Sequence, residues 1–325
     1  ILSGVASAFL LFGMALLYGA TGSLAFTDLI PPGGYDADAG PWMLMGIGMM
    51  LVALTFKLSL VPFHVWTPDV YEGAPAPVAT FLATVSKTAV FALLLRLFVS
   101  APITDNAWLL TLVGVLAFAS MLVGNLLALR QDNLKRLLGY SSIAHLGYLL
   151  TTLVAGASLS IEAVAVYLAT YVGTSLGAFG VVSLVSSPFA GKDAAHIDHF
   201  RGLYYKRPVL AVSMAIMMLS LAGIPLTMGF IGKFYILSVT MASGLWWLTG
   251  GVIVGSGIAL FYYLRVMAIL FMDRPAHARK PQLSGTGDNW AQTVVWLLAA
   301  ATILMGIYPA PLIDLAAVAG ITLGS

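Results

Sequence analysis

Long apolar stretches separated by short polar segments run along the whole chain and predict a series of membrane-spanning helices. A hydrocarbon core about 30 Å thick is crossed by about 20 consecutive apolar residues in a helix. Nine windows meet this requirement: residues 1–19, 41–66, 77–99, 107–129, 134–156, 161–187, 208–243, 246–271 and 290–309. The apolar tail at 311–320 is too short to cross and is expected to lie at the membrane interface.

Two of these windows are too long for one straight helix. Residues 208–243 would extend about 54 Å as a continuous helix, nearly twice the hydrocarbon thickness. Gly223 and Pro225 interrupt this window, and Pro62 interrupts the window at 41–66. We predict a single interrupted crossing for 208–243, because two crossings would move the later basic loops to the other side of the membrane. Broken helices at membrane depth need a cavity or packed protein beside them and are typical of transporters.

The two breaks have similar sequences, which suggests an internal repeat. The first reads Lys-Leu-Ser-Leu-Val-Pro at 57–62, and the second reads Leu-Ser-Leu-Ala-Gly-Ile-Pro at 219–225. A match this short also arises by chance between apolar helices, so both explanations stay open.

The charges of the loops predict the orientation of the chain, because Lys and Arg in short loops are retained on the cytoplasmic side. With alternating loops, one side receives Arg96 alone. The other side receives ten basic residues: Arg130, Lys135, Arg136, Lys192, Arg201, Lys206, Arg207, Arg274, Arg279 and Lys280. The loop at 21–40 contains Asp28, Asp36 and Asp38 and no base, so it is placed outside. The sequence is expected to begin on the cytoplasmic side and to end on the periplasmic side.

The composition supports the same class of protein and excludes others. Of 325 residues, 60% are apolar and 9% are charged, against about 25% charged in soluble domains. A soluble globular enzyme is excluded, because one core cannot hide so many apolar side chains. The absence of cysteine removes disulfides, thiolate metal sites and iron–sulfur clusters, and a net charge of +2 implies no nucleic-acid partner. Ile1 opens an apolar run without an initiator Met, so we expect a fragment that lacks an N-terminal part.

Three lysines, Lys57, Lys87 and Lys233, lie well inside the apolar windows. Each costs about 2.5–3.5 kcal/mol at a helix centre, so such residues are functional candidates by default. No Asp or Glu lies in the middle of a window, since Asp69 and Glu72 are placed in a loop. Burial without a counter-ion disfavours a charged amine, which makes these lysines candidates for reversible protonation. The alternative is an ammonium that extends to the headgroups, and Lys57 fits it best.

Two histidines are further candidates for a proton relay. His145 lies in the middle of the window at 134–156, among serine, threonine and tyrosine residues. A neutral imidazole both donates and accepts a hydrogen bond, which suits proton transfer, although a hydrogen-bonded core histidine has the same pattern. His64, two residues after Pro62, is either a second relay member or an interfacial cap.

The remaining polar residues have ordinary explanations beside the functional ones. Thr80 and Thr84 share the expected helix face of Lys87 and either hold water or allow close helix packing. Lys135 and Arg136 begin their helix at the membrane edge, where basic anchors are common.

A metal or a cofactor is not expected in this chain. His196 and His199 lie near Asp193 and Asp198 in a cytoplasmic loop, but solvated loop polarity explains them better than a metal site. The scattered histidines give no haem pairing, and no glycine-rich phosphate loop follows a strand.

Three motifs carry a resemblance to a known family. They lie at residues 57–77 with the Ser86–Lys87 pair, at 133–148, and at 223–235. In these motifs the chain resembles the antiporter-like membrane subunits of proton-translocating NADH:quinone oxidoreductase, respiratory complex I, and among them the subunit N family. Together they are distributed over most of the chain, and their combination is highly specific.

The resemblance implies an all-α polytopic membrane helical bundle with discontinuous helices and inverted repeats. The family fold has fourteen helices, of which this chain resembles helices six to fourteen, in agreement with nine windows. Residues 1–99 would complete the first antiporter-like repeat and residues 107–271 would form the second. Residues 272–325 would contain the final transmembrane helix and an interfacial tail.

The resemblance also implies roles for individual residues. Lys57 would pair with a glutamate on a preceding helix that this sequence does not contain. Lys87 and His145, with Lys135, would link the relay laterally, and Lys233 would face the outer exit. His64 remains a possible additional member.

The implied function is proton translocation by a subunit without a redox centre, in a translocase driven by quinone reduction elsewhere in the complex. NADH, FMN, iron–sulfur clusters and quinone would be bound by other subunits, and the partners would be other complex I membrane subunits and membrane lipids. The expected location is a bacterial inner membrane. One alternative is a subunit of a multi-protein sodium/proton antiporter, and another is a scaffold that only packs its neighbours.

Overall fold

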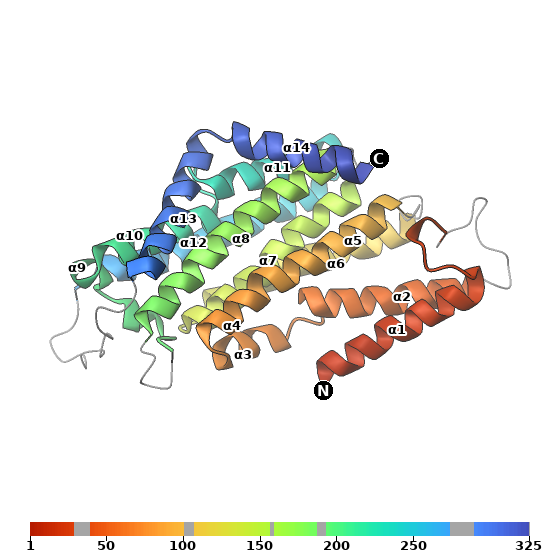
Figure 1. Cartoon of the computed structure of the whole chain (residues 1–325), viewed down its shortest axis with the longest axis horizontal. Coiled ribbons are helices and arrows are strands. Elements are labelled where there is room, and N and C mark those ends of the chain that lie inside the picture. Colours follow the sequence, from red (N-terminus) through yellow and green to blue (C-terminus); the bar gives the residue numbers. More distant parts are fainter. Residues whose placement is uncertain (29–39, 101–106, 157–158, 187–192, 274–288, 325) are drawn as a thin grey trace.

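The structure is a computed structural model that describes residues 1–28, 40–100, 107–156, 159–186, 193–273 and 289–324. These residues form a bundle of helices (Figure 1). The helices are α1 (Leu2–Thr21), η1 (Phe26–Asp28), α2 (Gly40–Leu58), α3 (Trp66–Gly73), α4 (Ala76–Phe81), η2 (Leu82–Ser86), α5 (Lys87–Ser100), α6 (Ala107–Leu129), α7 (Leu134–Ala155), α8 (Leu159–Val185), η4 (Ile197–Phe200), α9 (Leu203–Lys206), α10 (Pro208–Ala222), α11 (Met228–Ala242), α12 (Trp246–Phe271), α13 (Asn289–Ile307) and α14 (Ala310–Gly324). The expected all-α class is confirmed.

The helices follow the predicted windows closely. Within the described ranges, eight helices are long and apolar enough to cross a membrane. The ninth window, 208–243, is occupied by α10 and α11, which are apolar but too short to cross individually. At 1.5 Å per residue each extends only about 22 Å.

The interrupted helix crosses the bundle once, as predicted. The Arg207 guanidinium, at the start of α10, donates to the carbonyl of Leu184 at the end of α8 (3.1 Å). The Ser243 hydroxyl, just after α11, donates to the carbonyl of Ala155 (3.1 Å), at the end where α7 finishes and α8 begins. Because the length of α8 separates these two ends, α10 and α11 together run from one face of the bundle to the other.

Local hydrogen bonds replace those lost at the second break. Gly223 has φ +82°, a left-handed conformation that favours glycine. Its amide and that of Ile224 both donate to the Leu219 carbonyl (3.0 Å each). Farther on, the amide of Gly229 donates to Ser220 Oγ (3.0 Å). A Cβ at Gly229 would lie 1.9 Å from the Ser220 carbonyl oxygen, so the two half-helices touch only because this residue is glycine.

The first break is longer and ends in a helix that the sequence pattern places in a loop. α2 ends at Leu58, and α3 begins only at Trp66, whose indole donates to the Phe56 carbonyl (3.1 Å). The Val61 amide donates to Ser120 Oγ on α6 (3.0 Å). The predicted loop that carries the two acidic residues is therefore a short helix, because apolar periodicity is too weak over eight residues to reveal it.

α7 is the most buried of the long apolar helices. In the most apolar stretch of α7, 94% of the residues are buried, against 17% in the corresponding stretches of α1 and α13. Two glycines bring α7 and α6 together: a Cβ at Gly124 would lie 2.7 Å from the Ala144 amide, and one at Gly147 would lie 2.8 Å from the Met121 amide. Small residues at such crossings are the usual means of packing helices in a membrane. Residues along α7 are thus held inside protein on all sides.

The buried apolar core is continuous along the chain, from Leu17 on α1 to Ala299 on α13. The helices on both sides of the predicted boundary near residues 99–107 share it. The division into an end of one repeat and a complete second repeat stays a prediction.

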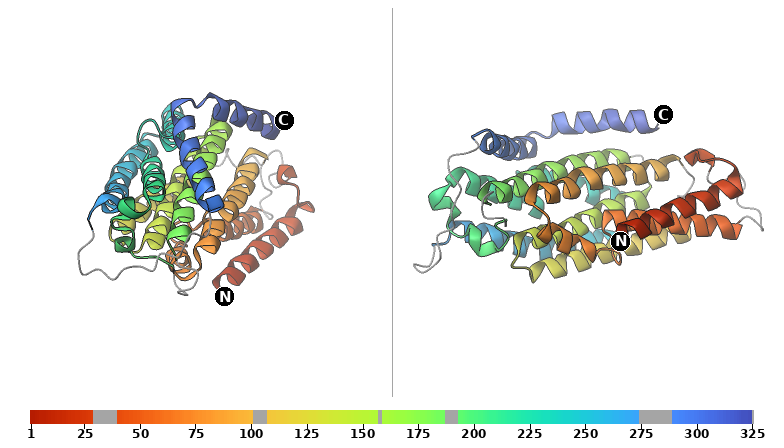
Figure 2. Two further views of the ribbon diagram at one scale, coloured as in Figure 1. Left: turned by 60° about the vertical axis from the view of Figure 1, so that its left-hand side comes forward. Right: turned by 60° about the horizontal axis from the view of Figure 1, so that its bottom comes forward.

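The C-terminal tail forms a longer helix than expected. α14 covers Ala310–Gly324 and packs against α8 on the outside of the bundle (Figure 2). Leu312 and Ala316 are buried against Val166 and Met228. The tail is therefore attached to the bundle by its apolar side chains, and its location at the membrane interface stays a prediction.

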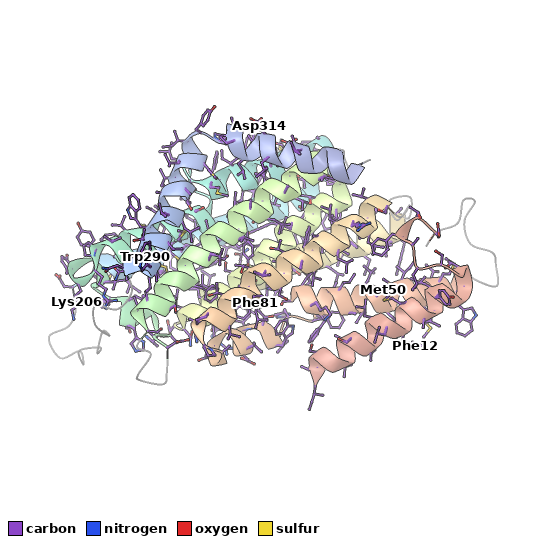
Figure 3. All side chains as sticks on the ribbon, in the orientation of Figure 1. Phe12, Met50, Phe81, Lys206, Trp290 and Asp314 are labelled. Carbon is purple, nitrogen blue, oxygen red and sulfur yellow. The ribbon has the colours of Figure 1, made fainter. Side chains whose placement is uncertain are left out.

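Loops that the charge pattern assigns to one side do meet on one face. The Ile197 amide donates to the carbonyl of Asp132 (2.8 Å), and the Arg265 guanidinium pairs with the Asp132 carboxylate. Lys206 stands at this end of the bundle, while Phe12 lies on α1 at the side of the bundle (Figure 3). Several charged residues used for the orientation lie outside the described residues: Asp36, Asp38, Lys192, Arg274, Arg279 and Lys280.

Candidate functional site

Lys87 is buried among three helices. It begins α5 directly after the π-helical turn η2, and it is 1% exposed. Its amine donates to the Ser142 hydroxyl on α7 and stands 5.7 Å from the centre of the Tyr71 ring on α3. The Tyr171 hydroxyl on α8 donates to the Ala83 carbonyl inside the π-helical turn (3.0 Å). Lys87 therefore meets a hydroxyl and an aromatic face, and no carboxylate pairs with it within the described ranges.

Lys233 is placed in a similar way farther along α7. It is 5% exposed, and its amine donates to the Ala222 carbonyl at the end of α10 (2.8 Å). The amine also stands 5.5 Å from the centre of the Tyr148 ring on α7. A Cβ at Gly223 would lie 2.7 Å from Lys233 Cδ, so the break in the helix makes the space that Lys233 fills. The Ala222 carbonyl, at the break, thus accepts a hydrogen bond from the Lys233 amine.

His145 lies between the two lysines along α7 and bonds through both ring nitrogens. Its Nδ1 is 2.7 Å from the Tyr167 hydroxyl on α8, and its Nε2 is 3.1 Å from the Tyr263 hydroxyl on α12. The Tyr263 hydroxyl also bonds to Ser141. Because a phenol can donate or accept, either tautomer of the neutral imidazole is satisfied.

One face of α7 organises the site. Ser141 and Ser142 lie four and three residues before His145, and Tyr148 lies three residues after it, so each of them shares a helix face with His145. Ser142 receives the Lys87 amine, and the Tyr148 ring lies beside the Lys233 amine. This stripe connects the surroundings of the two lysines through His145.

A small cavity separates His145 from the second broken helix. Its volume is about 10 Å³, and its lining includes the side chains of His145, Tyr167 and Ser220. A cavity of this size holds about one water molecule, provided that polar groups bind it. The cavity therefore lies between His145 and the break that receives Lys233.

A much larger cavity lies elsewhere and has a different character. It measures about 530 Å³ and lies between α2 and α6, with a lining that includes Leu51, Phe63 and Leu112. Its lining is almost entirely apolar, so it offers no path for a proton.

The other predicted site residues are not brought to this stripe. Lys57 lies in the last turn of α2, half-buried, and its side chain has no ion pair or hydrogen bond within the described part of the chain. His64 is half-buried in the connection between α2 and α3. Lys135 is ten residues before His145, about 15 Å along the helix axis, and pairs with Asp193 (2.7 Å).

Thr80 and Thr84, the residues expected to share a helix face with Lys87, both bond within their own helix. The Thr80 hydroxyl donates to the Ala76 carbonyl and the Thr84 hydroxyl to the Thr80 carbonyl (2.7 Å each). The π-helical turn between Thr80 and Lys87 changes the spacing on which the shared face was based.

Tyr148 is among the polar neighbours of His145 in the sequence, but four other tyrosines and an asparagine of the site are not identified by the sequence pattern. Tyr148 accepts from Asn125 Nδ2 (2.8 Å), and the Tyr262 hydroxyl donates to Asn125 Oδ1 (2.9 Å). The group is completed by Tyr71, Tyr167 and Tyr263. In an apolar window a tyrosine resembles any core aromatic, and the available signal is the presence of Asn125 in the middle of such a window.

The four residues considered for a metal site, His196, His199, Asp193 and Asp198, do not converge on one point. The Asp193 carboxylate pairs with Lys135, while His196 Nδ1 lies 3.5 Å from Asp198 Oδ2. No cluster of three or more His, Asp or Glu with metal-binding geometry is found in the ranges that the structure describes.

The chain is similar to known membrane proteins over nearly its whole length. The sequence profile described as "NADH:quinone oxidoreductase/Mrp antiporter, TM" matches residues 1–259. NADH-quinone oxidoreductase subunit N of Chromohalobacter salexigens is 58% identical over 316 residues, which are 97% of this chain and 66% of that protein. The chain thus spans slightly less than two thirds of this relative.

Two solved structures share the fold. A chain of respiratory complex I from Thermus thermophilus with bound aureothin superposes with a TM-score of 0.81 and 37% identity, over 96% of this chain and 66% of that one. A chain of the Mrp complex from a Dietzia species gives a TM-score of 0.85 at 20% identity, over 99% and 66%. The second likeness concerns the fold alone.

Proposed function

Because this chain belongs to the NADH:quinone oxidoreductase/Mrp antiporter transmembrane family, we propose that it translocates protons through Lys87, His145 and Lys233. The observation that carries the proposal is the position of His145. It bonds on both sides to hydroxyl groups, on the same face of α7 that meets a buried lysine at each end. Ionisable groups inside a membrane are expensive and mark ion pathways.

The chemistry of the relay follows from its members. Burial disfavours the charged ammonium form of an amine, and a nearby carboxylate favours it. A buried amine without a carboxylate partner therefore releases its proton more easily than a paired one. Serine and tyrosine hydroxyls and the neutral imidazole each accept a proton on one side while they release one on the other. A charge on one lysine disfavours a charge on its neighbour, so protonation states along the stripe are coupled.

The driving reaction is proposed to lie in other subunits. In this proposal the chain is a non-redox membrane subunit of an NADH:quinone oxidoreductase in a bacterial inner membrane. NADH, FMN, iron–sulfur clusters and quinone are bound by its partners. Lys57, half-buried on α2, would pair with a glutamate on a helix that, in the family, comes before the segment beginning at Ile1. Lys135, at the loop face, would take part in the lateral link of the relay.

A multi-protein sodium/proton antiporter is the second candidate, because the family description and the shared fold include the Mrp complex. The higher identity to subunit N favours the oxidoreductase. Transport that depends on NADH oxidation, rather than on a sodium gradient, distinguishes the two. A scaffold role would make lysine substitutions alter assembly without altering coupling.

The test replaces each buried lysine in the intact complex. We expect Lys87→Met and Lys233→Met to lower the number of protons pumped per NADH in vesicles while the complex still assembles. Lys206→Met, which removes an exposed ammonium at the loop face, is the matched control. Full pumping by both buried-lysine variants would show that the relay is wrong.

A further inference from the structure

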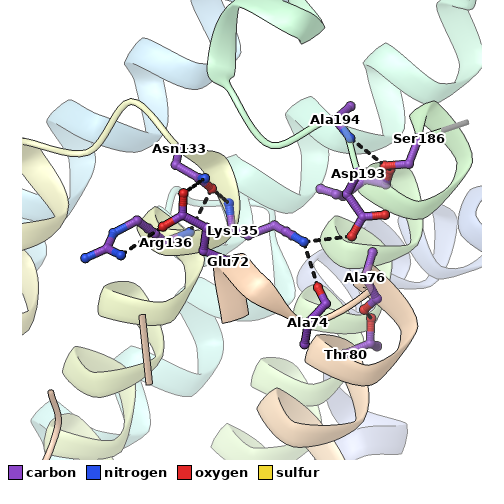
Figure 4. Close-up of polar contacts among 11 residues, drawn as sticks. Glu72, Ala74, Ala76, Thr80, Asn133, Lys135, Arg136, Ser186, Asp193 and Ala194 are labelled. Atoms are coloured by element: carbon purple, nitrogen blue, oxygen red, sulfur yellow. Dashed lines mark hydrogen bonds and ion pairs between the residues drawn. The ribbon is translucent and has the colours of Figure 1, made fainter. Parts of the chain in front are cut away.

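A group of ionic contacts away from Lys87, His145 and Lys233 ties α3 to the first turn of α7 (Figure 4). Arg136 Nη1 lies 2.5 Å from the Asp69 carboxylate and 2.8 Å from the Glu72 carboxylate. Asn133 Nδ2 donates to the other oxygen of Glu72 (2.8 Å). One guanidinium thus holds carboxylates from two positions on α3, and the residue that caps α7 holds one of them as well.

The neighbouring lysine attaches the end of α3. Lys135 Nζ donates to the carbonyl of Ala74, the residue that follows α3, and pairs with Asp193 (2.7 Å each). The Lys135 side chain is 3% exposed, whereas that of Arg136 is 27% exposed. We refer to one set of residues as the α3 clamp: Asn133, Lys135 and Arg136 with their partners Asp69, Glu72, Ala74 and Asp193.

The opposite face of α3 carries the aromatic ring that meets Lys87. Tyr71 lies between Asp69 and Glu72 in the sequence but is fully buried. Its ring centre is 5.7 Å from Lys87 Nζ, within the range of a cation–π interaction. A Cβ at Gly139 would lie 3.4 Å from Tyr71 Cδ2, so the ring also lies close to the α7 backbone. The position of α3 relative to α7 therefore decides where this ring stands.

α3 depends on such contacts for its position. It has eight residues, and isolated helices shorter than about 12–15 residues are marginal even in favourable sequences. α7, which supplies the clamp, also supplies the Ser142 hydroxyl that accepts from Lys87. Both neighbours of the Lys87 amine are thus positioned by one buried helix.

We propose that the α3 clamp positions Tyr71 against Lys87 and so sets how firmly the Lys87 amine retains its proton. Arg136 and Lys135 are positioning residues, since they act through α3. This inference rests on the proposed function, because it assigns the clamp to a lysine of the relay.

The test uses Asp69→Asn with Glu72→Gln in the intact complex, which removes both charges that face Arg136 with little change of shape. Asp314→Asn, on the exposed face of α14, is the control. Two quantities are measured: hydrogen–deuterium exchange of the peptide 66–74, and proton pumping as a function of pH. We expect faster exchange in α3 and an alkaline midpoint of pumping that shifts to lower pH by about half a unit, as loss of a cation–π contact predicts.

Each outcome supports or overturns the role of the clamp. Unchanged exchange would show that the clamp does not hold α3. Faster exchange with an unshifted pH midpoint, even with weaker pumping, would show a purely structural role. If the double variant does not assemble, Glu72→Gln alone should give a smaller change of both quantities, and no change would overturn the proposal. Full pumping by both Lys87→Met and Lys233→Met would instead reject the relay, while the exchange measurement would still report on the clamp.

Discussion

The Tyr263 hydroxyl lies 3.1 Å from His145 Nε2, so an unbroken helix, α12, completes the surroundings of the central histidine. Tyr167 supplies the other partner, from α8. The histidine is therefore held by two helices that are distinct from the interrupted ones.

Tyr263→Phe should lower proton pumping more than it lowers assembly. The change leaves His145 Nε2 and the Ser141 hydroxyl without their shared partner, and a buried polar group left unsatisfied costs about 1–3 kcal/mol. Pumping in vesicles and the melting temperature of the purified complex measure the two effects. Tyr18→Phe, on the exposed side of α1, is the control. Normal pumping by Tyr263→Phe would contradict a role for this tyrosine in the relay.

Gly223→Ala should disturb both the second break and Lys233. A left-handed conformation costs a non-glycine residue about 1–2 kcal/mol, and the added Cβ would lie 2.7 Å from Lys233 Cδ. Gly244→Ala is a close control, because Gly244 has φ +69° and a Cβ added there would meet no atom within 4 Å. We expect both variants to lower the melting temperature and only Gly223→Ala to reduce pumping. Equal pumping in the two would argue against a coupling of the break to Lys233.

Gly147→Ala should weaken the packing of α6 against α7. Its Cβ would lie 2.8 Å from the Met121 amide and 2.9 Å from the Ala117 carbonyl oxygen, both backbone atoms that cannot move aside. Overpacking of this kind costs about 1–3 kcal/mol. Gly257→Ala, where nothing lies within 4 Å, should leave the melting temperature unchanged or raise it slightly. A stable Gly147→Ala complex would show that the two helices can separate without loss.

Asn133→Ala should destabilise the start of α7. The Asn133 side chain accepts from the amides of Lys135 (2.9 Å) and Arg136 (3.2 Å), and loss of such a cap costs about 0.5–2 kcal/mol. Asn133→Ser keeps a capping oxygen and should recover most of the loss. The melting temperature of the complex measures the difference, and equal values for the two variants would mean that the cap contributes nothing.

The sequence is informative about the crossings because apolar length is a local property. The windows at 134–156 and 246–271 differ from α7 and α12 by at most a residue or two, and the break at Gly223 and Pro225 follows from backbone chemistry. Lys87, His145 and Lys233 can be selected as candidates because ionisable groups in apolar windows are rare.

What the sequence does not reveal is which side chains meet. Lys135 and Asp193 are 58 residues apart, and Tyr263 is 118 residues from His145, so neither pair leaves a periodic signal. The rotation of each helix about its axis, which decides whether a tyrosine faces the histidine or lipid, depends on packing against neighbours. The π-helical turn before Lys87 is likewise not visible in the residue pattern.

The cavity beside His145, about 10 Å³ in volume, bears on whether protons can leak through the bundle. Room for a single water molecule does not permit a continuous file of water, along which protons would run down the electrochemical gradient unassisted. Under the proposed function, this narrow space would limit passive return of protons through the chain and so help to preserve the proton gradient.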